Sequence, residues 1–339
     1  MKYLIFRNDR IGDFFITAPL IKAIKRQDKN SEVFIVCSNK NLELIKKIEY
    51  IDGYFLFNKK NLLDRIKFLL LLKKKKFDRI IVSDKKNRSI LFSFFLKSKE
   101  KIFNVSKNFQ YKLIKIFYNN VFLDNDSVKE GTYEILKRNA KCFGYDILRN
   151  DNFLPNKFHS GCNFFSFFDK SKNKILLHLD EKWHTEEYSI AYKKANKLTT
   201  IPLSSKDILN FAERTYAKGN YEMIISTGAI KTHIIEELKN ISELVKDNLY
   251  RIKTSSGSIY LVINLDLFNM FELISKSKIF ISCHGAFTHV ASNYGLFIYD
   301  IIEGGKLAHY NRITKHMSHY KPIYRKDFSS ISEEINLKL

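Results

Sequence analysis

Cysteine and arginine are scarce in this chain of 339 residues. The four cysteines lie far apart and form no C-x-x-C pair, so the sequence indicates neither a disulfide framework nor a zinc site, and a reducing cytosol is expected. Only 12 of the 58 basic residues are arginine, the side chain that dominates bidentate contacts with phosphates and base edges. The net charge of +22 therefore favours an anionic membrane or an anionic small substrate as partner, or reflects in part a composition rich in Lys, Asn, Ile and Phe, and no nucleic acid is expected.

Long apolar runs and glycine-rich nucleotide motifs are also missing. The most apolar run, Ile66 to Leu72, is much too short to span a bilayer, and the start MKYLIFRNDR runs into charges, unlike a signal peptide. No G-x-G-x-x-G follows the first predicted strand, so the dinucleotide fingerprint is absent. We expect a cytoplasmic protein, either soluble or peripheral on the inner face of the cytoplasmic membrane.

Strand and helix patterns alternate from the first residue. The apolar fraction of 45%, with 29 Phe and 18 Tyr, is typical of a folded globular protein. Apolar spacing predicts strands over residues 2–7, 31–38, 52–57, 77–84 and 101–106. It predicts helices over residues 17–27, 41–48, 62–75 and 87–96. Strands separated by helices of this length predict an α/β fold with a parallel, doubly wound sheet.

The alternation stops at residues 151–174, where a proline, a glycine and polar clusters predict a linker, and then restarts. Further strands are predicted over residues 174–180, 220–228, 258–266, 278–285 and, as the last strand, 296–302. Further helices are predicted over residues 187–198, 232–245, 267–276 and 288–294. We expect two doubly wound domains, residues 1–160 and 161–325, with a tail at 326–339 that forms a helix packing back on the N-terminal domain. A cleft between the domains is the expected ligand site.

The stretch RNDRIGDFFITAPLIKAIKR, residues 7–26, sets Gly12-Asp13 between the first strand and a helix. Glycine permits a tight bend there. Asp13 then lies near the helix start, where a carboxylate can cap free N–H groups and is favoured by the helix dipole. Alternatively, the carboxylate projects into the cleft as a general base. The local chemistry leaves both roles open.

A turn in the second domain carries a candidate anion site. In ISCHGAFTHVASNYG, residues 281–295, a strand ends at Cys283 and small residues precede a helix start, where backbone N–H groups can bind an anion. His284 can add a hydrogen bond or a positive charge there, and the alternative is an ordinary loop histidine. His289 lies inside the helix and is expected to be structural. Two histidines without a carboxylate partner do not indicate a metal site, and none is expected.

Two other strand ends of the second domain carry candidates. In LHLDEKWHTEEY, residues 177–188, Lys182 directly follows an apolar strand and could neutralise a diphosphate as a point charge. The alternative is a solvated surface lysine, one of many in this chain. Ser226-Thr227-Gly228 follows the next predicted strand and could face the same cleft.

Together these residues resemble the bacterial lipopolysaccharide heptosyltransferases, which form glycosyltransferase family nine. Residues 7–25 look like the N-terminal signature of that family, in which a Gly-Asp pair is followed by Thr-x-Pro-Leu and a helix. THVASNYG, residues 288–295, is similar to its C-terminal Ser/Thr-His-x-Ala-Ala-x-x-Gly element. The resemblance implies a GT-B fold, two Rossmann-like domains facing across a cleft, with the acceptor on the N-terminal domain and the nucleotide-sugar donor on the C-terminal one. It also implies inverting, metal-independent transfer without a cofactor.

Carried over residue by residue, Asp13 matches the proposed base of the family, and Arg10 and Gly12 lie beside it on the acceptor side. The candidate donor-binding residues are Lys182, Ser226, Thr227, Gly228, His284, Gly285, Ala286, Thr288 and His289. The chain departs from the family at the turn before His289, because His284-Gly285-Ala286 stands where Asp-Thr/Ser-Gly is usual. KWHTEE also replaces the usual Lys-x-Trp-Pro, so ADP-heptose is not assumed to be the donor.

We therefore expect a hexosyl- or heptosyltransferase that acts on a lipopolysaccharide-core or other surface-glycan acceptor, with capping as a compatible second role of Asp13. The acceptor is a saccharide or a lipid-linked saccharide. The alternative is a nucleotide-sugar epimerase, or another nucleotide-sugar-binding enzyme on the same fold.

Lysine and large apolar side chains are interleaved over residues 65–79 and 90–118. A peripheral helix would use this combination to bind an anionic membrane, which gives the hypothesis of weak membrane association. The alternative is a pair of ordinary core-facing helices with solvated lysines.

Overall fold

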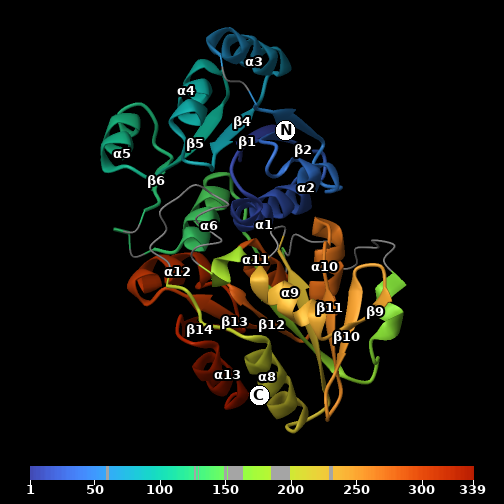
Figure 1. Ribbon diagram of the computed structural model, residues 1–339. Helices are drawn as coiled ribbons and strands as arrows, with labels where there is room; N and C mark the ends of the chain where they lie inside the picture. Colours follow the sequence, from blue (N-terminus) through green and yellow to red (C-terminus); the bar gives the residue numbers. More distant parts are fainter. Residues whose placement is uncertain are drawn as a thin grey trace. The chain divides into compact units, whose positions relative to one another are not determined.

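The computed structural model describes residues 1–58, 61–125, 127–128, 130–148, 151, 163–184, 199–228 and 232–339. The chain forms two compact units (Figure 1), each considered by itself below. The first comprises Met1–Phe153 together with Asn311–His316, and the second comprises Leu154–Tyr310 together with Met317–Leu339. A short segment near the C-terminus thus belongs to the N-terminal unit.

The first unit is built on a six-stranded parallel sheet with the order β3-β2-β1-β4-β5-β6. Its strands are β1 (Lys2–Phe6), β2 (Glu32–Cys37), β3 (Gly53–Leu56), β4 (Arg79–Val82), β5 (Glu100–Val105) and β6 (Val121–Leu123). Its helices are α1 (Ile11–Gln27), α2 (Leu42–Lys46), α3 (Leu62–Lys75), α4 (Asn87–Phe95), α5 (Asn108–Lys115) and α6 (Thr132–Cys142). This arrangement confirms the predicted doubly wound sheet.

The two faces of this sheet are covered by different helices. Leu4 and Phe6 of β1 belong to one apolar cluster with side chains of α3, α4 and α5. Neighbouring strand residues point to opposite faces. Tyr3, which alternates with Leu4, instead contacts Phe143 at the end of α6, and α6 packs on α1. The α3, α4 and α5 helices therefore share one face of the sheet, and α1 and α6 share the other.

The second unit contains an eight-stranded sheet with the order β14-β13-β12-β7-β8-β11-β10-β9. Its strands are β7 (Asn173–Leu179), β8 (Tyr221–Thr227), β9 (Glu243–Lys246), β10 (Leu249–Lys253), β11 (Ser258–Val262), β12 (Ile279–Cys283), β13 (Phe297–Ile302) and β14 (Tyr320–Tyr324). Its helices are α8 (Ser205–Tyr216), α9 (His233–Asn240), α10 (Leu267–Ser275), α11 (Ala286–Asn293) and α13 (Phe328–Asn336). Another helix, α12 (Leu307–Thr314), leads into the segment of the first unit. All neighbouring strands are parallel except in the β9–β10 and β10–β11 pairs, which are antiparallel.

Several elements differ from the predictions. The α1 helix starts at Ile11 and not at residue 17, and α11 starts at Ala286 and not at residue 288. The helix predicted over 232–245 ends at Asn240, because the chain then turns into the β9–β10 hairpin at the sheet edge. The strand predicted as the last one, β13, is followed by β14. The predicted helix at 187–198 and most of the predicted linker lie outside the described residues.

The C-terminal tail forms the predicted helix, α13, but its apolar face packs within the second unit. Phe328, Ile331 and Ile335 are fully buried and belong to the core cluster of that unit. The Phe328 ring lies 5.9 Å from Trp183 and 5.7 Å from Phe211 of α8, measured between ring centroids. These contacts lie in the core of the second unit, whereas packing on the N-terminal domain was expected. In the described part of the chain, no helix is long and apolar enough to cross a membrane.

We expect Phe328→Ala to lower the free energy of unfolding of the second unit by about 3–5 kcal/mol, because the substitution leaves a cavity beside two buried rings. Trp183 is the only tryptophan and is fully buried, so urea unfolding followed by its fluorescence reports on this unit. Leu337→Ala, at a side chain that is 84% exposed, is the control and should change stability by less than about 0.5 kcal/mol. Equal effects of the two variants would contradict the packing of α13.

Candidate functional site

Asp13 lies in the first turn of α1, and Gly12 is helical. The Asp13 Oδ2 atom accepts the backbone N–H of Arg10, the residue before the helix, at 3.4 Å. The carboxylate therefore has the position of a helix cap, which is one of the two roles considered from the sequence. The expected tight bend at Gly12 is not formed, because residues 7–10 make the connection between β1 and α1.

Arg7 fixes the start of α1 against the sheet. Its guanidinium is buried, and its Nε atom donates to the backbone carbonyl of Asp13 at 2.8 Å. Another nitrogen, Nη1, donates to the carbonyl of Ser83, at the end of β4, at 2.5 Å. The same nitrogen pairs with Asp9 Oδ2 at 3.3 Å. One buried cation therefore joins the ends of two neighbouring strands to the first turn of the helix.

A pocket of about 550 Å³ opens at the carboxyl ends of the strands in the first unit. This is where ligands bind in doubly wound sheets. Arg10 and Asp13 both line it. The other lining residues are Asn8, Asp9, Ser38, Asn39, Lys40, Phe57, Asn58, Lys86 and Arg88. With four cationic and two acidic side chains, the pocket suits a polar ligand that carries hydroxyl and anionic groups.

Asp9 is a second carboxylate in this pocket that the sequence analysis did not single out. Its Oδ1 atom is buried and has no hydrogen-bond partner among the described residues. Burial raises the pKa of Asp9 to about 6, although Arg7 opposes the change, and Asp13 raises it further. The signal that could have found Asp9 is its place at the end of a buried strand, four residues before Asp13.

Lys86 and Arg88 converge on Asn8 from the segment that follows β4. Lys86 Nζ donates to the Asn8 backbone carbonyl at 2.6 Å and to its Oδ1 atom at 2.7 Å. Arg88 donates to the same Oδ1 atom at 3.2 Å and lies over the Phe57 ring. Burial lowers the pKa of Lys86, but the Asp84 and Asp9 carboxylates oppose that change. The two cations are therefore held in place before any ligand binds.

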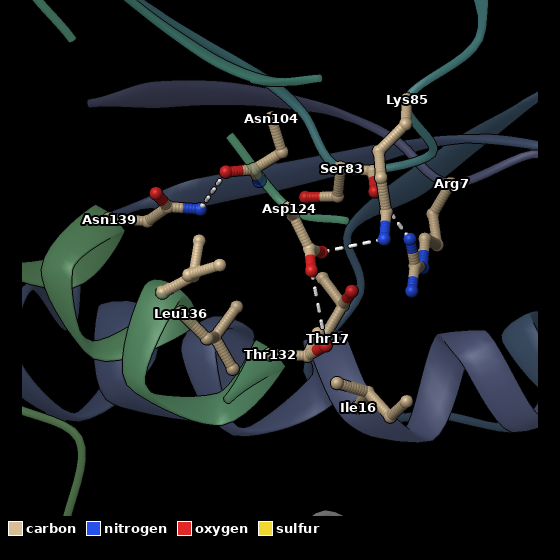
Figure 2. A pocket seen from close by; sticks show the side chains of 11 residues that line it. Arg7, Ile16, Thr17, Ser83, Lys85, Asn104, Asp124, Thr132, Leu136 and Asn139 are labelled. Carbon is tan, nitrogen blue, oxygen red and sulfur yellow. Dashed lines mark hydrogen bonds and ion pairs between the residues drawn. The ribbon is translucent and has the colours of Figure 1, made fainter. Parts of the chain in front are cut away.

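A much smaller polar cavity, about 20 Å³, is lined by residues of α1, of α6 and of the segments that follow β4 and β6 (Figure 2). Asp124 lines it and pairs with Lys85 at 2.6 Å and with Arg312, while Thr132 of α6 donates to it at 3.3 Å. Burial alone would raise the pKa of Asp124, but Lys85 and Arg312 outweigh it and the pKa is lowered. The cavity has room for a single water molecule, so this cluster ties α6 to the sheet and is not a ligand site.

In the second unit, Lys182 lies against the turn that follows β12. Its Nζ atom pairs with Asp180 at 2.6 Å and donates to the backbone carbonyl of His284 at 3.1 Å. A Cβ atom on Gly285 would lie only 2.5 Å from this Nζ atom. Burial alone would lower the pKa of Lys182, but Asp180 outweighs it and the pKa is raised, so the ammonium is charged. The structure thus brings Lys182, His284 and Gly285 together.

His284 has a carboxylate partner that the sequence did not reveal. Its Nδ1 atom lies 2.6 Å from Asp300 Oδ2, on the neighbouring strand β13. Tyr320 donates to the same oxygen at 2.7 Å, and Thr288 donates to the other oxygen at 3.1 Å. Asp300 therefore orients both the histidine and the first turn of α11. No local signal could have found it, because it lies sixteen residues after His284.

The remaining candidates lie at different depths. Gly228 lies close to Asp180 and Glu181, the two residues before Lys182, since a Cβ atom on Gly228 would lie 3.0 Å from each of them. Ser226 is fully buried and bonds to His178, so its side chain points into the fold. Thr227 ends β8 and is half-buried. Ala286 begins α11, while Thr288 and His289 are buried in it, and the His289 ring lies 5.6 Å from that of His284.

No cluster of three or more His, Cys, Asp or Glu side chains in the described ranges is placed to hold a metal ion. Two positions in the described residues suit a polar or anionic ligand at strand ends: the charged pocket of the first unit and the Lys182–His284–Gly285 corner of the second. Two Rossmann-like units, each with a polar site at its strand ends, define the chain as a protein of the GT-B fold.

Solved structures of known proteins share this fold. A family 9 glycosyl transferase from Veillonella parvula is 12% identical with a TM-score of 0.63, and covers 99% of this chain and 89% of its own. The E. coli heptosyltransferase WaaC with ADP is 11% identical with a TM-score of 0.63, over all of both chains. A UDP-N-acetylglucosamine 2-epimerase is 11% identical with a TM-score of 0.50, and covers 99% of this chain and 87% of its own. No protein-family model and no curated protein matches the sequence. The likeness confirms the fold that the sequence signatures predict.

Asp9 should make the stability of the protein depend on pH. Because its pKa is raised in the folded state, ionisation of Asp9 between about pH 4 and pH 6 destabilises the fold. We expect the free energy of unfolding of the wild type to fall over this window, relative to Asp9→Asn, by on the order of 2 kcal/mol. Urea unfolding at a series of pH values measures this difference. Asp247→Asn, at an exposed side chain, is the control. A difference between wild type and Asp9→Asn that stays constant with pH would contradict the prediction.

Proposed function

We propose that this protein is an inverting, metal-independent glycosyltransferase that moves a sugar from a nucleotide-diphosphate sugar to a saccharide acceptor. The observation that carries the proposal is the pocket of the first unit, in which Asp13 and Asp9 lie among four cationic side chains. The shared fold with a family 9 glycosyl transferase and with a heptosyltransferase supports it.

In this proposal Asp13 is the general base. It takes the proton of an acceptor hydroxyl as that oxygen attacks the anomeric carbon, on the face opposite the leaving diphosphate. Its only described side-chain contact is the long bond from the Arg10 N–H, so the carboxylate keeps oxygen lone pairs for an acceptor. Asp9 also lines the pocket, so its carboxyl group can bind a second hydroxyl of the same sugar.

The donor diphosphate binds at the Lys182–His284–Gly285 corner. An ammonium has three N–H donors, and the contacts of Lys182 with Asp180 and His284 account for two of them. The N-terminus of α11 adds backbone N–H groups and the positive end of a helix dipole. These groups stabilise the charge on the leaving diphosphate, so the reaction needs neither a metal ion nor a cofactor.

The Asp300–His284 pair supplies a feature that distinguishes this chain from the family it resembles. Its turn has no carboxylate of its own, but Asp300 brings one to the same place through His284 Nδ1. The Nε2 atom of His284 can then donate to a phosphate oxygen when the ring is protonated. We therefore assign the donor only as a nucleotide-diphosphate sugar and not as ADP-heptose.

The acceptor in this proposal is a lipopolysaccharide-core sugar or another surface glycan, free or lipid-linked, and the protein acts in the cytoplasm. An epimerase on the same fold is the alternative, and it needs no acceptor. Incubation with a nucleotide sugar alone separates the two, because an epimerase changes the sugar while a glycosyltransferase leaves it bound to the nucleotide. A thermal-shift panel of nucleotide diphosphates first identifies the nucleobase of the donor, since selective binding raises the melting temperature.

Asp13→Asn should lower the rate of sugar transfer at least a hundredfold and leave nucleotide binding unchanged, because the amide cannot accept the proton. The amide oxygen can still accept the Arg10 N–H, so the cap and the stability are kept. Asp13→Ala should lose transfer and also about 1 kcal/mol of stability.

Asp207→Asn is the matched control, because Asp207 also closes a capping box, with Ser204 at the start of α8. It should leave transfer unchanged. If Asp13→Asn retains full activity, Asp13 is a cap only and the base assignment fails.

Gly285→Ala should weaken binding of a nucleoside diphosphate at least tenfold, because the new Cβ atom would lie 2.5 Å from Lys182 Nζ and displace the ammonium. Isothermal titration with the diphosphate found in the thermal-shift panel measures the change. Gly305→Ala is the control, since its Cβ atom would meet nothing within 4 Å. Unchanged affinity in Gly285→Ala would place the diphosphate elsewhere.

A further inference from the structure

The α3, α4 and α5 helices lie on one face of the sheet of the first unit (Figure 1), with their outer sides turned away from it. Their inner sides share a single core cluster, which includes Phe68 of α3, Phe92 of α4 and Ile114 of α5. The helices therefore lie on the same face of the sheet, and what they do not bury is presented to solvent together. We call this the α3–α5 surface, residues 61–118.

This surface is unusually apolar for one that faces solvent. Of the 21 large apolar side chains exposed in the described part of the chain, twelve belong to it. They are Leu62, Leu63, Ile66, Leu70, Leu71, Leu91, Phe94, Phe95, Phe109, Leu113, Ile116 and Phe117. Ile116 is 74% exposed and Phe117 is 67% exposed, so neither contributes much to the core. An exposed apolar patch of this kind marks an interaction site.

The stretch of chain that contains this surface carries more than half of the net charge of the protein, although Arg79, Lys85, Lys86 and Arg88 in that stretch lie away from the surface. Residues 61–118 contain 16 Lys or Arg and four Asp or Glu, a net charge of +12 out of +22. Within the described ranges, no ion pair joins Lys73, Lys74, Lys75 or Lys76 to a carboxylate. The lysines have stems long enough to lie along the apolar patch while their ammonium groups reach outward.

A pocket of about 560 Å³ lies where the end of α3 meets the end of α4. Its apolar part is formed by Leu72, Phe77, Phe95 and Leu96. Lys73, Lys76, Lys97 and Lys99 surround it, together with Ser98 and the single acid Asp78, which pairs with Lys99. Four ammonium groups around an apolar floor match a phosphate group attached to a hydrocarbon chain.

We propose that the α3–α5 surface binds the anionic phospholipid face of a bilayer, and that the Lys73–Lys99 pocket takes a lipid phosphate. The exposed Leu, Ile and Phe side chains enter the interface between headgroups and acyl chains, and the lysines neutralise the headgroups. A nucleic-acid surface would instead use arginine for phosphate and offer fewer exposed aliphatic side chains. Of the three arginines in residues 61–118, only Arg65 belongs to this surface, because Arg79 begins β4 and contacts Tyr3 on the other face of the sheet, and Arg88 lines the Asp13 pocket.

The test is flotation of the full-length protein with vesicles of phosphatidylglycerol and phosphatidylcholine in equal parts, against vesicles of phosphatidylcholine alone. We expect binding to the anionic vesicles only, weakening as salt is added. Lys73→Gln/Lys76→Gln/Lys97→Gln should lower the partition coefficient at least tenfold, since each lysine near an anionic surface contributes about fivefold. Ile116→Ser/Phe117→Ser, which leaves the charge unchanged, should lower it by a similar factor.

Matched controls lie in the second unit. Lys206→Gln/Lys246→Gln/Lys321→Gln removes the same charge from exposed positions, and Ile241→Ser/Leu244→Ser removes exposed apolar side chains. Both should bind vesicles like the wild type, and circular dichroism checks that every variant folds. Equal binding to neutral vesicles, equal losses in the control variants, or binding to duplex RNA without binding to vesicles would overturn the proposal. Because flotation reads binding and not sugar transfer, its outcome is separate from that of the proposed function.

Discussion

The buried guanidinium of Arg7 is the interaction on which the site of the first unit depends. It joins the ends of β1 and β4 to the first turn of α1, and it does so mainly through backbone carbonyls. The direction of α1 is therefore set by a charged group with few alternative partners inside the fold. Because Arg10 and Asp13 lie in or next to that turn, the position of the candidate base follows from an interaction that contains no part of a substrate.

Much of the fold could be predicted from the sequence, because apolar periodicity reports on burial against a sheet. It failed where a tertiary contact overrides local spacing. The start of α1 was placed too late because Phe14, Phe15 and Ile16 are consecutive apolar residues without a helical spacing, and all three are buried. The β9 strand was taken for helix because Ile241 and Leu244 continue the spacing of α9, and its pairing with β10 decides its structure.

The candidate site was predicted in part, and the missing part has a common cause. Lys182 and His284 closely follow strands, and Asp13 lies in the first turn of the helix after β1, so these positions are visible in a sequence. Asp300 acts on His284 across two paired strands, and a pairing register is not visible in one sequence. The sequence thus suggested that the chain had lost a carboxylate at this turn. The structure shows that a carboxylate reaches the turn from the neighbouring strand.

The Asp124–Arg312 pair has an evolutionary consequence. The carboxylate and the guanidinium stand 188 residues apart in the chain, yet both belong to the first unit. A gene fusion that joined the N-terminal half of this protein to a foreign C-terminal half would leave Asp124 with one of its two cations. A chimera of this kind therefore loses a buried ion pair of the first unit unless the new C-terminal half supplies a cation at the position of Arg312.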